Sequence, residues 1–319
     1  MGEADVGFRS KLCKFFGLDR SSVYRQRKLG VKDKLLAAQI RAVCLDHPGY
    51  GHRRIADHLG IGKNRIRRVM KLEDIPSPKR RKRKYTKVSK GSESAPTNLL
   101  KPHKVAKTDG EIVDVEGFVA LRPYHIWAED FTYLWFDNRF YYLATVIDLY
   151  SRQIVGWSLG IHHDTELVTK ALMDAVSKYP TPAIIHNDQG KEYLSRIYQT
   201  ICDSLEITTS ASAAGCPWEN PFQESFYNHF KEELDANNLS RFDNEGQLFE
   251  AIAYQLHYYN TKRIHSALHT NPAAYAARFY QTQDQQKTTG KKQNTNQQTK
   301  TSQRVLIVKR DRVLQNVRT

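Results

Sequence analysis

Hydrophobic and polar residues alternate with a period of two in three consecutive stretches of the chain that begin just after Arg122. The stretches read HIWAEDFTYLWF, RFYYLATVIDLY and QIVGWSLG, and short connections at Asp137-Asn138 and Ser151-Arg152 separate them. A period of two is typical of β-strands, and connections this short join antiparallel neighbours. The pattern therefore predicts a three-stranded antiparallel meander.

After the meander, helical periodicity alternates with short apolar runs. The helical pattern covers residues 167–179, 193–205, 219–234, 244–259 and, more briefly, 272–280, whereas AIIH and ITTS are the short runs of strand type. Strands followed by alternating helices and strands form a layered α/β fold. We therefore predict an α/β domain over residues 122–282, built on a mixed five-stranded sheet with flanking helices.

A helical module is predicted ahead of this domain, over residues 31–75. A helix over 34–45 is followed by the turn segment HPGYGHRRI, a second helix, the Gly60-Ile61-Gly62 turn and the helical sequence KNRIRRVMKLE. A solvated helix face normally mixes the two signs of charge, so a face that is basic for two turns favours DNA contact through a helix-turn-helix. Its outward residues are Lys63, Asn64, Arg65, Arg67, Arg68 and Lys71.

The remaining segments are small or irregular. Residues 1–30 contain two amphipathic runs around a Gly17-Leu18 turn, a pattern that fits a helix-turn-helix and two small solvated helices equally well. Residues 281–303 have the composition of disordered chain, and 304–313 allow one basic strand within the basic tail over 283–319.

Residues 76–121 form a basic linker. A nuclear-localisation-like signal and a passive tether are alternatives, but its position between recognition modules and an acidic core favours an arm along the DNA backbone. The residues of this arm are Arg80, Arg81, Lys82 and Arg83.

The charge of the chain is unevenly distributed. The 319 residues carry a net charge of +15, yet residues 122–282 hold 12 basic and 19 acidic side chains. A strongly basic protein usually binds nucleic acid, so we expect basic arms that hold DNA around an acidic core.

The four cysteines form no Cys-x-x-Cys pair and no apolar run reaches the length of a membrane span. We therefore expect a soluble protein of the reducing cytoplasm with no membrane partner.

Two aspartates in the acidic domain occupy positions that suggest a function for the carboxylate. Asp130 lies inside the first predicted strand, and no Lys or Arg occurs between Pro123 and Asn138 to neutralise it. An acid in an apolar strand costs several kcal/mol unless it is paired or bound to a metal. Asp188 follows the short strand AIIH and lies beside Gly190, which lets a substrate approach the backbone closely.

A third acid, Glu224, lies on the predicted helix over 219–234. Alone it would be an ordinary solvated side chain, but Asn228 and Lys231 follow it at helical spacing on the same side. Three carboxylates without other ligand types select hard divalent ions such as Mg²⁺ or Mn²⁺. Two ions roughly 3.5 to 4 Å apart would clamp the attacking and leaving oxygens of a phosphoryl transfer.

These residues lie in segments that resemble a known family. The segments WAEDFTYL, FYYLATVIDLYSRQIVGW, HNDQGKEY, GCPWENPFQESFYNHFKEEL and YYNTKRIHSAL are similar to the catalytic core of bacterial insertion-sequence transposases with a retroviral-integrase-type domain. YGHRRIADHLGIGKNRIRRVMKLEDI resembles the helix-turn-helix that precedes that core. The resemblance runs from residue 8 to about residue 280.

The resemblance implies a ribonuclease-H-like fold in which Asp130, Asp188 and Glu224 hold two Mg²⁺ or Mn²⁺ ions. It also implies that Lys231 contacts the transposon-end DNA, with Asn228 one turn nearer the acid. Other residues of the matching segments have less definite roles. Arg263 and His265 are open to backbone contact or to packing, and packing is the expected role of Trp127 and His186.

Two departures from the family pattern bear on fine positioning: Asn187 stands where the family usually has Ser, and Ile264 where it has Pro. The chain also begins near the family's second reading frame, which suggests either a partner protein from the upstream frame or a frameshifted fusion. Because two transposon ends must be brought together, the resemblance further implies a homo-multimer on double-stranded DNA at the bacterial nucleoid.

The function expected from these features is a DNA transposase that binds terminal inverted repeats, cleaves the 3′ end of the element and transfers that strand. Two alternatives remain at this level. A ribonuclease-H-like nuclease that cuts without joining has no need of the helix-turn-helix modules, and a catalytically silent DNA-binding regulator has no need of all three acids.

Overall fold

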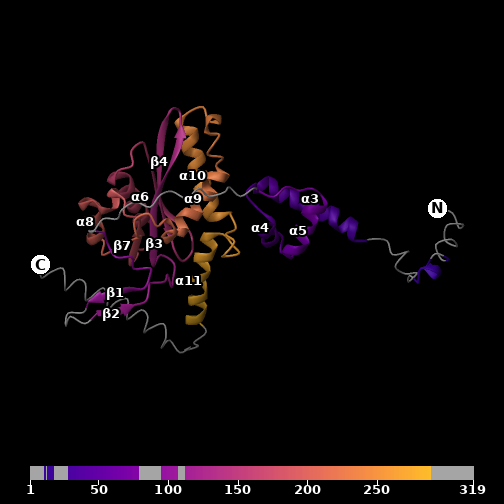
Figure 1. The fold of residues 1–319 in the computed structure, drawn as a ribbon, viewed down its shortest axis with the longest axis horizontal. Coiled ribbons are helices and arrows are strands. Elements are labelled where there is room, and N and C mark those ends of the chain that lie inside the picture. Colours follow the sequence, from indigo (N-terminus) through magenta and orange to yellow (C-terminus); the bar gives the residue numbers. More distant parts are fainter. Residues whose placement is uncertain (1–10, 12, 18–27, 79–94, 107–111, 289–319) are drawn as a thin grey trace.

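The protein is described by a computed structural model that covers residues 11, 13–17, 28–78, 95–106 and 112–288. Its largest part is built on a five-stranded sheet with helices on both faces (Figure 1). The strands are β3 (Ile126–Phe136), β4 (Arg139–Asp148), β5 (Ile154–Gly160), β6 (Ile184–Asn187) and β7 (Thr208–Ala211).

The order of the strands across this sheet is β5-β4-β3-β6-β7. The first three form the predicted antiparallel meander, and β6 and β7 pair parallel to β3. Asp137 and Asn138, with φ of 47° and 56°, form the two-residue turn between β3 and β4. Left-handed backbone at both positions is the conformation that matches the twist of a hairpin, and Asp and Asn adopt it readily.

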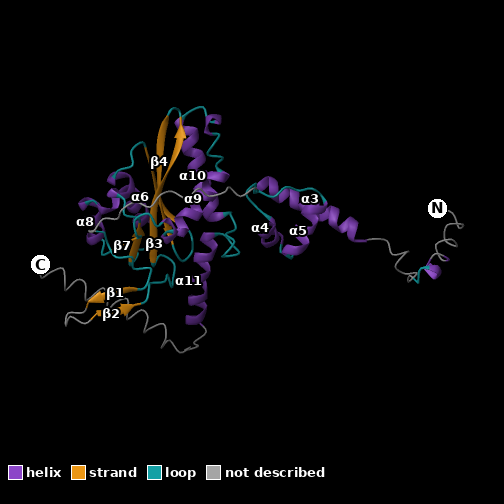
Figure 2. Ribbon diagram, in the orientation of Figure 1, coloured by secondary structure: helices purple, strands orange, loops and turns teal. Residues whose placement is uncertain are grey.

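Two hydrophobic cores lie on the two faces of this sheet because β3 and β4 bury side chains in both directions. One core is closed by α9 (Pro221–Glu233) and α10 (Glu245–Thr261), and the other by α6 (Thr165–Lys178) and α8 (Arg196–Ser204) (Figure 2). The remaining helices of the domain are α7 (Lys191–Leu194), α11 (Pro272–Thr288) and the short 3-10 turns η1 (Pro217–Glu219) and η2 (Leu239–Arg241). None of the described helices is long and apolar enough to cross a membrane.

Three expectations about these helices were wrong in detail. The helix predicted over 193–205 is interrupted at Ser195, whose hydroxyl caps α8 by accepting from Tyr198 N at 3.3 Å. The helix expected from residue 219 begins at Pro221, because proline at the first helical position gives up only an amide that would lack a helical partner. The last helix continues to Thr288, so disorder was wrongly predicted for 281–288.

A separate helical module comprises α3 (Lys28–Asp46), α4 (His52–Leu59) and α5 (Lys63–Leu72), and its first helix begins six residues before the one expected over 34–45. It has its own core, and Ile264 of the large domain packs against that core. Gly60 ends α4 in the left-handed conformation, with φ of 64°, and its amide donates to Ala56 O. This glycine produces the turn between the last two helices of the module.

The linker contains structure that its composition did not predict. Strands β1 (His103–Ala106) and β2 (Ile112–Val115) form a two-stranded antiparallel sheet. Ahead of them, Leu99 is buried, and Glu219 accepts hydrogen bonds from Asn98 at 2.6 Å and Lys101 at 2.6 Å. The linker is therefore fastened to the sheet domain beside α9. The predictions for most of residues 1–30, for Arg80 to Arg83 and for the tail beyond 288 lie outside the described residues.

We expect Gly156 of β5 to be intolerant of any side chain. A Cβ there would lie 2.4 Å from Ala171 O and 2.6 Å from the Ala175 Cβ, where α6 crosses the strand. Gly156→Ala should therefore reduce the free energy of unfolding by about 1 to 3 kcal/mol in urea titrations, as overpacked cores do. Gly30→Ala is the matched control, because no heavy atom lies within 4 Å of its Cβ position. Equal stabilities of the two variants would contradict this packing.

Candidate active site

The first two predicted acids are brought together by neighbouring parallel strands. Asp130 lies in β3, and Asp188 follows the last residue of β6, which pairs with β3 in a register that aligns Ala128 with His186. The Asp188 carboxylate accepts from Gly190 N at 2.8 Å, so the glycine fixes the loop that carries it. The carboxyl end of β6 thus places its acid beside the middle of β3.

The third acid is positioned by a buried polar anchor on α9. Gln223 donates to a main-chain carbonyl of β3 at 2.8 Å and to the Thr145 carbonyl of β4 at 2.7 Å. One turn later, Tyr227 OH donates to the Asp130 carbonyl at 2.5 Å. Glu224 lies between these two residues, so neutral hydrogen bonds hold its helix against the strand that carries Asp130.

The acids interact through their charges. Burial, followed by the negative charges of Asp188 and Glu224, raises the pKa of Asp130 from 3.8 to about 8, against the opposing effects of Phe131 N and Lys231. Burial also raises the pKa of Asp188. A carboxyl whose pKa is raised by neighbouring acids is the electrostatic sign of a site that lacks positive charge.

Lys231 is a cation that faces these acids from α9. Its ammonium lies 4.6 Å from the centre of the Tyr133 ring and is half-buried. Burial lowers its pKa, while the charge of Asp130 raises it. Asn228, one turn earlier, is exposed. The structure thus agrees with the expectation that Lys231 lies on the acids' side of the helix.

The donor set of this site fits a hard divalent cation. Carboxylate oxygens are the ligands that Mg²⁺ and Mn²⁺ prefer, and the mutual repulsion of the acids would be relieved by such an ion. In the part of the chain that the structure describes, no three His, Cys, Asp or Glu side chains are already close enough to form a metal cage. Asp188 and Glu224 act electrostatically on Asp130 without forming such a cage.

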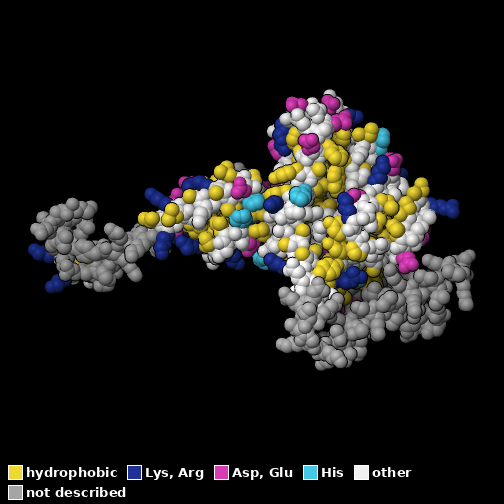
Figure 3. All heavy atoms as spheres, turned by 180° about the vertical axis from the view of Figure 1, so that it is seen from behind, with side chains coloured by type: hydrophobic (Ala, Val, Ile, Leu, Met, Phe, Trp, Pro, Cys, Tyr) yellow, Lys and Arg dark blue, Asp and Glu magenta, His cyan; other side chains and the backbone are white. Residues whose placement is uncertain are grey.

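A second predicted surface lies on α5. All six of its proposed DNA contacts are exposed, while Ile66, Val69 and Met70 form the buried face of the helix. Arg68 also pairs with Asp33 at 2.8 Å. Figure 3 shows Lys and Arg side chains along the edges of this module. The basic face of α5 is therefore exposed to solvent, on the side of the helix opposite its buried residues.

Arg263 occupies a different environment from that of a DNA contact. Its side chain is 1% exposed, and Nε donates to Glu233 at 2.7 Å. Burial, with repulsion from Arg263 and two other arginines, lowers the pKa of the adjacent His265 to about 4. Of the two roles left open for these residues, the structure favours packing, and the assignment of Arg263 as a DNA contact is corrected accordingly.

Trp127 and His186 are packing residues, as expected. Trp127 is completely buried in the core beneath α6. His186 is hydrogen-bonded to Ser210 at 2.9 Å and to Ser212 at 3.0 Å. Burial lowers the pKa of His186 to about 4, so it is neutral at pH 7.

Glu129 was missed by the sequence analysis. It is fully buried on the opposite face of β3 from Asp130 and accepts a hydrogen bond from Tyr198 OH at 2.5 Å. Burial raises its pKa well above the ordinary range, followed by a smaller effect of Asp130. The signal was available, because the argument from an acid in an apolar strand without cations applies equally to this residue.

Comparison with known proteins defines the class of this protein, a transposase with an integrase-type core. Residues 120–217 and 205–272 match two models of the integrase core domain. The chain is 34% identical over 254 residues to the transposase of insertion sequence element IS904 from Lactococcus lactis, covering 76% of this chain and 94% of that one. The chain therefore belongs to the family of insertion-sequence transposases.

Two other relatives agree with this assignment, and a solved structure is similar over part of the chain. A 31 kDa protein of insertion element IS600 from Shigella sonnei is 28% identical over 85% of this chain and 99% of its own length. The transposase InsF of IS3A from Escherichia coli is 39% identical over 37% of this chain and 42% of its own. Among solved structures, the HTLV-2 integrase catalytic core aligns with a TM-score of 0.43 and 22% identity over 50% of this chain and 99% of that one. The sheet order and its flanking helices are those of the ribonuclease-H-like fold.

We expect Asp130→Asn to stabilise the protein in the absence of divalent ions. The pKa of Asp130 is about 8 in the folded protein and 3.8 ordinarily. Between these two pH values the Asp130 carboxyl is therefore protonated in the folded state and ionised in the unfolded state. The free energy of unfolding of the wild type should therefore fall as pH rises from about 4 to 8, and remain low above that range. Asp130→Asn removes this fall and should be more stable at pH 8, by an amount on the order of a few kcal/mol.

Thermal unfolding in a chelator across this pH range measures the difference between the two proteins. Glu250→Gln, an exposed acid on α10, is the control and should follow the wild type at every pH. Added Mg²⁺ should stabilise the wild type and not Asp130→Asn. A constant difference between wild type and Asp130→Asn from pH 4 to 8 would contradict the raised pKa.

Proposed function

We propose that this protein is a DNA transposase that cleaves the 3′ ends of its element and joins them to another DNA site. The observation that supports the proposal is that Asp188, at a strand end, and Glu224, on a helix, both act electrostatically on Asp130 of the central strand. These residues lie in a chain that matches the integrase core domain. Water would attack the phosphodiester at the element's end and release a 3′ hydroxyl. That hydroxyl would then attack a target phosphodiester, forming the new bond and releasing the target's own 3′ oxygen.

The three acids would hold the divalent ions, two Mg²⁺ or Mn²⁺ in the arrangement we favour. When bound, such ions supply activation of the attacking oxygen and stabilisation of the departing one. The protein's own residues would position the DNA. Lys231 would contact a phosphate of the element's end from α9, with Asn228 beside it, while Gln223 and Tyr227 keep the helix aligned.

Recognition of the terminal inverted repeats is assigned to α5. Its exposed face carries five cations and one amide on two turns, which suits phosphate and base contacts in a major groove. The linker residues Arg80 to Arg83 would add contacts along the DNA backbone. Because two ends take part in one reaction, we further propose a homo-multimer, with an upstream-frame protein as a possible additional partner.

Asp188→Asn should abolish both end cleavage and strand transfer while leaving end binding intact, because it removes a ligand charge and no part of the recognition module. The measurement is cleavage and joining of a labelled duplex taken from the DNA that flanks the gene, in Mg²⁺, beside a gel-shift assay of the same duplex. Asp243→Asn, an exposed acid of the same domain, is the charge-matched control. Cleavage retained by Asp188→Asn would refute the proposal, and nicking by the wild type without joining would favour a simple nuclease.

Lys63→Ala combined with Arg67→Ala should weaken binding of that duplex and flatten its salt dependence. Each phosphate contact that is lost reduces the slope of log K against log salt by about one. Gel shifts or anisotropy at several salt concentrations give the slope. Lys170→Ala and Lys178→Ala, two exposed cations on α6, are the control pair, and the assignment of α5 fails if both double variants lose the same slope.

A further inference from the structure

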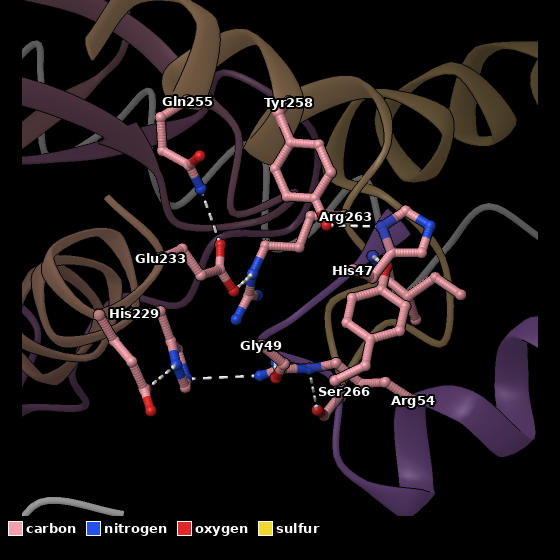
Figure 4. Close-up of polar contacts among 12 residues, drawn as sticks. His47, Gly49, Arg54, His229, Glu233, Gln255, Tyr258, Arg263 and Ser266 are labelled. Carbon is pink, nitrogen blue, oxygen red and sulfur yellow. Dashed lines mark hydrogen bonds and ion pairs between the residues drawn. The ribbon is translucent and has the colours of Figure 1, made fainter. Parts of the chain in front are cut away.

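Two motifs of the sequence that the proposed reaction does not use meet each other in the structure. One is YGHRRI, residues 50–55, at the start of α4, and the other is YYNTKRIHSAL, residues 258–268, which covers the last turn of α10 and the segment that follows it. They are about two hundred residues apart in the chain, yet they form the contact between the α3–α5 module and the sheet domain (Figure 4). We call this contact the docking interface.

Main-chain and aromatic groups make the first part of the docking interface. Tyr50 is 1% exposed, and its hydroxyl accepts from Ile264 N at 2.7 Å. His47 is hydrogen-bonded to Tyr258 OH at 2.6 Å, and its ring stacks on Tyr50 with centroids 4.4 Å apart. A buried tyrosine of one module whose hydroxyl is satisfied by a main-chain amide of the other marks an interface that is part of the fold.

Arg54 makes the second part. Its guanidinium donates to Gly49 O at 3.0 Å within its own module, and to Ser266 Oγ at 3.2 Å and His229 Nε2 at 3.4 Å in the sheet domain. Burial, followed by repulsion from Arg263, lowers its pKa to about 10, so it remains a cation at pH 7. Because its N–H groups donate to other residues of the protein, we do not expect Arg54 to contact DNA.

In the sheet domain, the residue that faces these contacts is itself held in place by hydrogen bonds. Glu233, the last residue of α9, accepts from Arg263 Nε at 2.7 Å and from Gln255 Nε2 at 2.8 Å. Gly49 of the module lies directly over it, because a Cβ at that position would be 2.6 Å from Glu233 Oε1 and 3.0 Å from its Cγ. The glycine is needed for this close approach, since the carboxylate is fixed by two partners and cannot turn away.

One helix therefore connects the docking interface with the catalytic acids. Glu224 lies near the start of α9 and Glu233 at its end, a separation of about 14 Å at 1.5 Å per residue. We propose that the docking interface fixes the DNA-recognition module on the helix that carries Glu224, so that the bound DNA end reaches the acids in one register. Arg54 and Gly49 are then positioning residues, and the inference rests on the proposed function above.

The interface leaves the recognition surface available. None of the hydrogen bonds described above involves α5, and its basic residues stay exposed while the module is docked. Loss of docking should consequently spare end binding and impair only the step that requires the end and the acids to be aligned. A misplacement of about 1 Å in a reacting group costs on the order of 100-fold in rate, so the effect on cleavage should be large.

The experiment uses the full chain and two matched pairs of variants. Gly49→Ala places a methyl group against Glu233 and should force the interface apart. Gly51→Ala is its control, because no heavy atom lies within 4 Å of the Gly51 Cβ position. Arg54→Met removes the docking donors but keeps an apolar stem, and Arg53→Met removes the same charge from an exposed neighbour. Hydrogen exchange of residues 50–55 and 258–268 reports whether the interface is closed.

We expect Gly49→Ala and Arg54→Met to increase exchange in both segments and to bind the flanking-DNA duplex as their controls do. Their single-turnover cleavage rate at saturating DNA should fall by about 100-fold, with cuts spread over several phosphodiesters. Cleavage at the wild-type rate and position by a variant whose interface has opened would overturn the inference, as would an interface that exchanges freely in the wild type. A wild type that is protected there but never cuts DNA would instead refute the proposed transposase activity and leave the docking itself established.

Discussion

The structure depends on neutral interactions that hold acidic side chains near one another. Asp188 and Glu224 repel Asp130, and burial together with these charges raises the pKa of Asp130 to about 8. Neutral interactions hold their supports in place: the parallel pairing of β3 with β6, and the Gln223 and Tyr227 hydrogen bonds that fasten α9. A site assembled in this way keeps its elements in position before any cation arrives.

The same reasoning explains why α9 is anchored so heavily. Its first turns bond to β3 and β4, Phe226 and Phe230 enter the core, and Glu233 at its end is fixed by Arg263 and Gln255. A helix that is restrained along its full length can transmit position from one end to the other. Separating the buried Glu233 and Arg263 pair would leave an uncompensated charge, which is costly. The pair therefore keeps this end of the helix in one position.

Much of this could be predicted from local sequence. The alternating pattern located β3 to β5, the Asp137-Asn138 pair predicted the hairpin turn, and the absence of cations around Asp130 predicted an unusual acid. Glu129 was overlooked because its neighbour had already accounted for the acid in that strand. The continuation of α11 to Thr288 was missed because a Gln- and Thr-rich segment has the composition of disordered chain.

The docking interface lay beyond prediction for a different reason. Tyr50 and Ile264 are 214 positions apart, and neither of their segments carries a periodicity that indicates a partner. Arg263 illustrates the consequence, because an arginine in a basic protein that acts on DNA invites a phosphate contact, and only its burial against Glu233 corrects that interpretation.

The division of charge along the chain acquires a structural meaning from this interface. The domain of residues 122–282 has more acidic than basic side chains, so by itself it would repel the DNA on which it acts. In the proposed transposase the attraction would come from the basic face of α5 and from the arms, and attraction alone would leave the DNA end free to approach in many orientations. A docked module would resolve both difficulties, because its cations would bind the end while the contacts of Tyr50 and Arg54 with the sheet domain fix the direction from which that end reaches the acids.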